Sequence, residues 1–183
     1  MTSYTLKVIQ MGDIQYIVGQ LLSIVAVVLG FISYQMKTPK GVITFQIITA
    51  FVFSVHYLMI GVMPAMALNF LSGINSVFFY IREKRGSKSL IVPLYVITSV
   101  IVTSLMTWDG WYSALIMVGL VVGAISLAVS DTQKTRVCML IKSPLCLIYN
   151  IIVFSTGGII YECAVLVSSV LGLVRNRKAE IAK

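Results

Sequence analysis

The chain has little charge, few acidic residues and almost no histidine. Only 11% of its 183 residues are charged, six are acidic and one is a histidine, whereas 58% are hydrophobic. A soluble domain carries about 25% charged and about 45–50% apolar residues. A water-soluble fold cannot hide this much apolar surface, so the composition excludes soluble globular, disordered and nucleic-acid-binding proteins. It predicts an integral membrane protein instead.

Cysteines are few, and motifs of soluble enzymes are absent. The three cysteines, Cys138, Cys146 and Cys163, form no CxxC motif and lie inside apolar stretches, where they fit small packing residues. We therefore expect no disulfide framework, no metal site and no cofactor. The chain also has no GxSxG, HExxH or P-loop motif, so we do not expect an enzyme.

Apolar stretches long enough to cross a bilayer occupy most of the chain. A transmembrane helix needs about 20 apolar residues. Seven such stretches run over 14–35, 42–61, 64–82, 90–107, 112–130, 135–155 and 158–175. The turns between them are too short to hold a soluble domain. Because lipid-facing backbone must satisfy its own hydrogen bonds, the sequence predicts one compact all-α bundle of seven transmembrane helices.

Basic residues divide unequally between the two sides of this bundle. One side, formed by the N-terminus and the turns after the second, fourth and sixth stretches, carries only Lys7. The other side carries twelve basic residues: Lys37, Lys40, Arg82, Lys84, Arg85, Lys88, Lys134, Arg136, Arg175, Arg177, Lys178 and Lys183. Basic loops stay in the cytoplasm, so we expect the N-terminus outside and the C-terminus inside. The net charge of +8 then reflects topology rather than an acidic partner.

The two halves of the chain share one pattern of apolar stretches and breaks. A shift of 93 residues aligns 30–85 with 123–178 without a gap. The predicted division is an outer N-terminal segment (1–13), a first triple-helix bundle (14–85), a linker helix (86–111), a second triple-helix bundle (112–178) and a cytoplasmic tail (179–183). A single linker helix gives both triplets the same orientation, as in SWEET-type transporters. The alternative is that the halves are two unrelated three-span segments.

Two polar patterns inside the apolar stretches resemble those of a known family. The first half reads H-[FY]-x-x-x-G-x-x-P-A at His56-Tyr57, Gly61 and Pro64-Ala65, and the second reads N-x-x-x-x-[ST]-x-G-G-x-x-x-E at Asn150, Ser155, Gly157-Gly158 and Glu162. Over 14–178 the chain is similar to the YgjV-like bacterial inner-membrane family (Imp-YgjV), which looks like a distant relative of the SWEET, PQ-loop and PnuC transporters. The resemblance implies a seven-helix 3+1+3 bundle in the bacterial cytoplasmic (inner) membrane. The chain has no Pro-Gln dipeptide, so it departs there from the SWEET pattern.

Polar side chains inside the stretches define the candidate site. Such groups are costly in a bilayer and face a cavity or a partner. The candidate substrate-binding residues are Gln46, His56, Tyr57, Asn69, Asn75, Lys142, Tyr149, Asn150 and Glu162. At 1.5 Å per residue, His56, Asn69, Asn150 and Glu162 all lie about 9 Å from the outer ends of their helices, in one polar belt. The alternative is that these groups only form hydrogen bonds between helices.

Glu162 and His56 are the candidates for proton coupling. Glu162 is the one acidic residue inside a span, and burial favours the neutral form of an unpaired carboxyl. Histidine changes charge near neutral pH, and a His56–Glu162 pair is one arrangement that the sequence allows. For Lys142 two interpretations compete: its ammonium either extends to the cytoplasmic surface or lines a cavity that opens inward.

Three functions remain open at this point. The first is a facilitator or proton-coupled carrier that moves a small polar metabolite by alternating access between the two triplets. The second is a non-transporting membrane receptor or assembly factor, and the third is an intramembrane enzyme that uses His56 and Glu162 as acid and base. The expected partners are a small-molecule substrate and the lipid bilayer, with no nucleic acid, and the SWEET-like architecture also allows a homo-oligomer.

Overall fold

The computed structural model describes residues 13–36, 39–87, 89–128 and 132–181. This part of the chain consists of seven α-helices and the turns between them. The helices are α2 (Asp13–Gln35), α3 (Pro39–Met59), α4 (Met63–Lys84), α5 (Ile91–Met106), α6 (Ser113–Ala128), α7 (Thr132–Ile152) and α8 (Thr156–Ile181). The prediction of an all-α chain with seven helices is confirmed. Most of the predicted N-terminal segment, residues 1–12, and the end of the tail, 182–183, lie outside the described residues.

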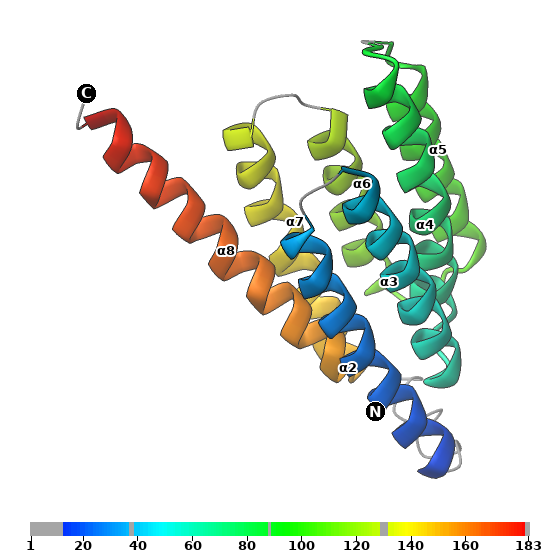
Figure 1. Ribbon diagram of the computed structural model, residues 1–183. Helices are drawn as coiled ribbons and strands as arrows, with labels where there is room; N and C mark the ends of the chain where they lie inside the picture. The colour runs from blue at the N-terminus through cyan, green and yellow to red at the C-terminus, as the bar shows by residue number, and fades with distance from the viewer. Residues whose placement is uncertain (1–12, 37–38, 88, 129–131, 182–183) are drawn as a thin grey trace.

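The helices form one bundle (Figure 1), and the contacts between them close it into a ring in chain order. Each helix from α2 to α7 packs against the next one along the chain, and α8 returns to pack against α2. α5 therefore connects α4 to α6 in space as well as in sequence. In such a ring, all seven helices can present side chains to one common interior.

Four of the helices are long and apolar enough to cross a membrane. These are α2, α4, α7 and α8, whereas α3, α5 and α6 contain shorter apolar stretches. α5 and α6 have 16 residues each. At 1.5 Å per residue they are about 24 Å long, compared with about 30 Å for a hydrocarbon core. They are shorter than the spans 90–107 and 112–130 that the sequence predicts.

The outer surface of the ring is apolar. Phe31, Phe51, Phe70 and Phe78, for example, are between 37% and 49% exposed. Many other large aliphatic side chains on all seven helices are also exposed. A bilayer removes these side chains from water, so contact with lipid explains a surface that no soluble protein of this size would carry.

The two ends of the ring differ in charge. The last turns of α2, α4, α6 and α8 lie at one end of the ring, opposite the first turn of α2 (Figure 1). Among the basic residues at this end, called the basic end below, are Arg82, Lys84, Arg85, Lys134 and Arg136. Lys7, Lys37, Lys88 and Lys183 lie outside the described residues. The opposite end is called the turn end, because the tight α3–α4 and α7–α8 turns lie there.

These two turns have the same backbone geometry, 93 residues apart. In the first, the amide of Val62 donates to the Tyr57 carbonyl at 2.8 Å, and in the second Ser155 donates to Asn150 at 3.0 Å. A residue with positive φ precedes each donor: Gly61 at 74° and Phe154 at 52°. Glycine adopts this conformation without strain, whereas phenylalanine does not, so sequence identity is lost at a position where the backbone geometry is kept.

The structure shifts the last two helices relative to the sequence prediction. The predicted break at 156–158 lies inside the first turn of α8, and α7 covers 132–152 rather than 135–155. Ser155 is the reason, because its hydroxyl accepts the amide of Gly158 at 3.2 Å and caps α8. α8 also continues to Ile181, beyond the predicted end at 175.

Candidate functional site

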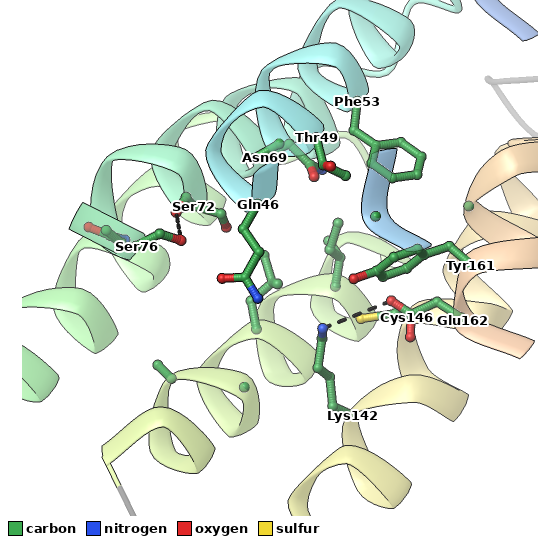
Figure 2. Close-up of a pocket in the computed structure, with 18 of the residues that line it drawn as sticks. Gln46, Thr49, Phe53, Asn69, Ser72, Ser76, Lys142, Cys146, Tyr161 and Glu162 are labelled. Atoms are coloured by element: carbon green, nitrogen blue, oxygen red, sulfur yellow. Dashed lines mark hydrogen bonds and ion pairs between the residues drawn. The ribbon is translucent and has the colours of Figure 1, made fainter. Parts of the chain in front are cut away.

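A cavity lies in the centre of the ring and is lined by all seven described helices (Figure 2). Its volume is about 250 Å³. Gln46, Lys142, Tyr161 and Glu162 point into the same space from α3, α7 and α8. The cavity is smaller than typical pockets for drug-sized ligands, which start at about 300 Å³, so its size suits a small metabolite.

Seven of the nine predicted binding residues line this cavity. They are Gln46, Tyr57, Asn69, Asn75, Lys142, Asn150 and Glu162. The other two, His56 and Tyr149, are fully buried and lie outside the lining. The ring of Tyr149 packs against that of Tyr112, with centroids 6.0 Å apart.

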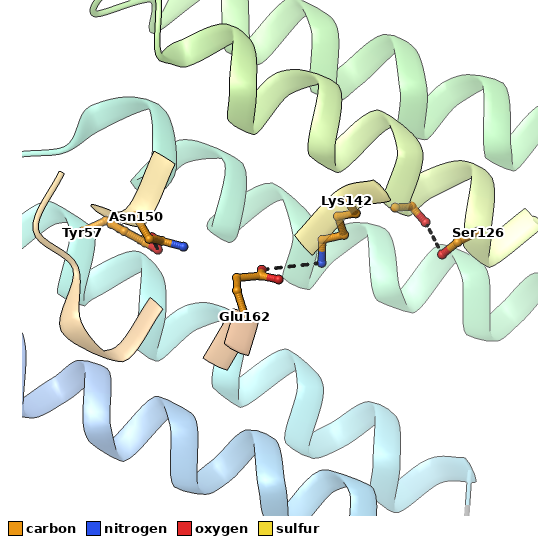
Figure 3. A network of polar contacts seen from close by, with 6 residues as sticks. Tyr57, Ser126, Lys142, Asn150 and Glu162 are labelled. Atoms are coloured by element: carbon orange, nitrogen blue, oxygen red, sulfur yellow. Dashed lines mark hydrogen bonds and ion pairs between the residues drawn. The ribbon is translucent and has the colours of Figure 1, made fainter. Parts of the chain in front are cut away.

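Lys142 and Glu162 form an ion pair across the cavity wall (Figure 3). The Lys142 Nζ lies 4.0 Å from the Glu162 Oε1, and the two side chains are 17% and 8% exposed. This contact decides between the two interpretations of Lys142, because its ammonium points to the cavity rather than to the surface. The opposite charges of the two side chains offset the cost of removing each of them from water in the cavity wall.

Three buried oxygen atoms in the lining have no hydrogen-bond partner in the described part of the chain. They are Oε2 of Glu162, Oδ1 of Asn75 and Oγ1 of Thr49. The three residues are only 6%, 4% and 7% exposed. Buried polar atoms are nearly always hydrogen-bonded, and a polar molecule or water in the cavity would satisfy these three oxygen atoms.

Tyr57 and Asn150 form the floor of the cavity at the turn end. The Tyr57 hydroxyl donates to Oδ1 of Asn150 at 2.6 Å, which joins α3 to α7. Both residues are 4% exposed. Below them, a layer of fully buried residues closes the turn end: His56, Ile60, Val62, Tyr149, Val153 and Ser155.

His56 holds this closed layer together. Its Nδ1 lies 2.7 Å from the Gly19 carbonyl oxygen, and its Nε2 lies 2.8 Å from the Ser155 hydroxyl. A carbonyl only accepts, so Nδ1 carries the proton and Nε2 accepts from Ser155. The His56–Glu162 pair that the sequence allowed is not formed, because both ring nitrogens of His56 point to other partners.

Further hydrogen bonds join α2 to the start of α8, and we call this set the clasp. Tyr16 and Gln20 both donate to the carbonyl of Phe154, at 3.3 and 2.6 Å. Gln20 and Ser23 accept the amides of Thr156 and Gly157, each at 3.1 Å. Together with Ser155, these side chains satisfy three first-turn amides of α8 that a helix cannot bond internally. The clasp therefore closes the ring at the turn end.

Sequence reasoning missed Gln20, Ser23 and Tyr161. Gln20 is an amide inside an apolar stretch, which is the signal that identified the other amides. Ser23 gives no such signal, because serine is common in transmembrane helices. Tyr161 lies next to Glu162 and lines the cavity, where its ring contacts Phe53 edge-on at 5.7 Å.

The cysteines differ in position. Cys146 is buried and lines the cavity, Cys138 is half-buried and Cys163 is exposed, and all three are free thiols. Among the described residues, no three His, Cys, Asp or Glu side chains lie close enough together to hold a metal ion.

Comparison with known proteins gives one match. The family model of Imp-YgjV, a bacterial inner membrane protein, matches residues 17–180. The match covers most of the chain, so the chain belongs to this family and is a multi-pass protein of the bacterial inner membrane. Neither the curated proteins nor the solved structures include a match to this chain.

Proposed function

We propose that this member of the Imp-YgjV family is a membrane carrier of a small polar metabolite. The observation that carries the proposal is the central cavity, which all seven described helices line and which contains a buried ion pair and three unpartnered oxygen atoms. Hydrogen bonds that only held helices together would leave no such space. A binding site near the middle of the bundle is what alternating access requires.

We further propose that the carrier consists of two parallel three-helix repeats, α2–α4 and α6–α8, which α5 links. Six pairs of residues 93 positions apart line the same cavity: Gly30 and Gly123, Gln46 and Met139, Thr49 and Lys142, Phe53 and Cys146, Tyr57 and Asn150, and Asn69 and Glu162. One pair, Tyr57 and Asn150, is in direct contact. Equivalent residues meet at a two-fold axis, so this contact supports an axis along the membrane normal. The matching α3–α4 and α7–α8 turns support the same arrangement.

We place the basic end in the cytoplasm and the turn end outside, because basic loops stay inside. The N-terminus is then external. The conformation described here is closed on the outside by the clasp and by the buried layer that contains His56. An outward-facing conformation requires these contacts to separate while the basic end closes.

Energy coupling is either absent, as in a facilitator, or depends on a proton. Glu162 is the stronger candidate for the proton site, because its carboxylate lines the cavity and one oxygen has no partner. His56 lies in the layer that must open, so its protonation would act on opening rather than on binding.

We propose that the chain is not an enzyme, although one contact resembles a catalytic dyad. The Ser155 hydroxyl lies 2.8 Å from Nε2 of His56, which is the distance of a nucleophile from its base. Ser155 is fully buried, however, and its oxygen already accepts the amide of Gly158. An oxyanion would need free amides nearby, but the amides of Thr156 and Gly157 are bonded to Gln20 and Ser23.

Uptake into proteoliposomes tests the proposal. We expect Glu162→Gln and Asn150→Ala to abolish uptake of the transported solute while the protein remains folded. Cys163→Ser is the matched control, because Cys163 follows Glu162 in α8 but is exposed. In a proton-coupled carrier, uptake by the unaltered protein depends on pH, whereas in a facilitator it does not. Normal uptake by both cavity variants would contradict the site, and solute binding without any transport would favour a receptor.

A further inference from the structure

The charges inside the cavity limit the solute that it accepts. Among the residues that line the cavity, Lys142 is the one basic residue and Glu162 the one acidic residue, so the formal charges of the lining cancel. A solute with a net charge would leave the buried site with an uncompensated charge, which is costly in a region of low dielectric. The cavity therefore favours a solute without net charge.

The lining also limits the hydrogen-bonding groups of the solute. Oε2 of Glu162 and Oδ1 of Asn75 can only accept hydrogen bonds, and neither has a donor. On the other side of the ion pair, Lys142 can only donate. The amide of Gln46 extends toward Lys142 across the cavity (Figure 2). A solute that fits has strong donors at one end and an acceptor at the other.

The ion pair itself is loose. Its atoms are 4.0 Å apart, the outer limit for such a contact, whereas a charge-assisted hydrogen bond between an ammonium and a carboxylate is about 2.7–2.9 Å. A molecule that inserts an ammonium beside Glu162 and a carboxylate beside Lys142 replaces the long contact between these two residues by two short ones. The rings of Phe53 and Tyr161 supply an apolar wall for the rest of the molecule.

We propose that the cavity binds a small zwitterion, an amine and a carboxylate on one short carbon chain, of the size of an amino acid. Its ammonium donates to Oε2 of Glu162 and its carboxylate accepts from Lys142. A volume of about 250 Å³ corresponds to roughly eight water molecules, which suits a small solute better than a disaccharide or a nucleotide. This inference rests on the proposed carrier function, because it names the class of solute for the same site.

The first test is binding to the purified protein in nanodiscs. The probe is a ¹⁴C-labelled mixture of the twenty common L-amino acids with β-alanine and γ-aminobutyrate. The competitors are the same compounds unlabelled, their N-acetyl derivatives, which have no ammonium, and their methyl esters, which have no carboxylate. We expect saturable binding of the label that the unlabelled zwitterions displace. Both derivatives should bind at least about ten-fold more weakly, because each of them lacks the charge that would pair with Glu162 or with Lys142.

Variants show whether the two charges act together. Glu162→Gln and Lys142→Met should each lower the affinity at least about ten-fold, whereas Cys163→Ser leaves it unchanged. Because a single charge removal can impair folding, the exchanged double variant Lys142→Glu/Glu162→Lys is the decisive one: it keeps the cavity neutral and should bind zwitterions better than either single variant. Equal binding of the N-acetyl derivatives or the esters would overturn the proposal.

Counterflow in proteoliposomes separates this inference from the carrier function. Vesicles are loaded with the amino-acid mixture, with a polyol and pentose mixture, or with a nucleoside mixture, and uptake of the matching label is measured. Counterflow of amino acids alone supports both proposals. Counterflow of polyols, pentoses or nucleosides without amino acids overturns the zwitterion site and keeps the carrier. Zwitterion binding without any counterflow would overturn the carrier function and support the zwitterion site. The absence of zwitterion binding and of counterflow would overturn the zwitterion site.

Discussion

Gly157 is a position of close approach between α8 and α2 in the clasp. A Cβ added at Gly157 would overlap the Ser23 side chain and lie 2.6 Å from the Ser23 carbonyl oxygen. An ordinary carbon–oxygen contact is at least about 3.3 Å, so Gly157→Ala must move the helices apart by at least about 0.7 Å. It must also weaken the hydrogen bond from the Gly157 amide to Ser23.

The cost of this substitution falls on the closed conformation of the turn end. Overpacking of one methyl group costs about 1–3 kcal/mol. In the proposed mechanism, the outward-facing conformation separates α2 from α8 and avoids this cost. A difference of 1–3 kcal/mol changes the ratio of two conformations about 5- to 150-fold, so Gly157→Ala should populate the outward-facing form by this factor.

Cys146 reports on this change because its thiol lines the cavity. In a protein that also carries Cys138→Ala and Cys163→Ala, a membrane-impermeant thiol reagent added outside should label Cys146 at least about five-fold faster after Gly157→Ala. Gly73→Ala is the matched control, because its added Cβ would have no contact shorter than 3.4 Å. Unchanged labelling from outside in Gly157→Ala would refute the role of the clasp as an outer gate.

Three further substitutions test individual contacts by thermal unfolding. Tyr57→Phe leaves Oδ1 of Asn150 buried without its donor and should cost about 1–3 kcal/mol, whereas the double variant with Asn150→Ala should cost less than the sum of both. Lys142→Met leaves the Glu162 carboxylate buried and unpaired and should cost about 3–5 kcal/mol; adding Glu162→Met should recover most of this, and no recovery would show that the two charges are uncoupled. Ser155→Ala removes the cap of α8 and the donor to His56, and should lower the free energy of unfolding by about 1–2 kcal/mol. An unchanged melting temperature would show that this cap does not stabilise the fold.

The sequence predicts the helices and most of the cavity lining from two local signals. Polar groups such as Glu162, Lys142 and Asn150 are costly inside apolar helices, so they lie where a cavity or a partner compensates them. The breaks between helices follow from charge and turn residues. Both signals are local, and both can be read from a single chain.

Contacts across the ring could not be predicted in this way. Whether His56 meets Glu162 or Ser155 depends on how far each helix is rotated and on the contact between α2 and α8 that closes the ring. Ser23 gives no signal because a serine inside a membrane helix often bonds its own backbone. The start of α8 was misplaced because Gly157 and Gly158 suggest a turn, whereas Gln20, Ser23 and Ser155 cap their amides and keep them helical.

Alternating access is tested most directly by labelling Cys146 from both sides of the membrane in the same set of variants. The rates are measured in right-side-out and inside-out vesicles for the protein with Cys138→Ala and Cys163→Ala, and again after Gly157→Ala. We expect labelling mainly from the basic end at first, and a faster rate from the turn end with a slower rate from the basic end after Gly157→Ala. Rates that rise together from both sides would indicate an open pore, and labelling that stays confined to one side would contradict a carrier.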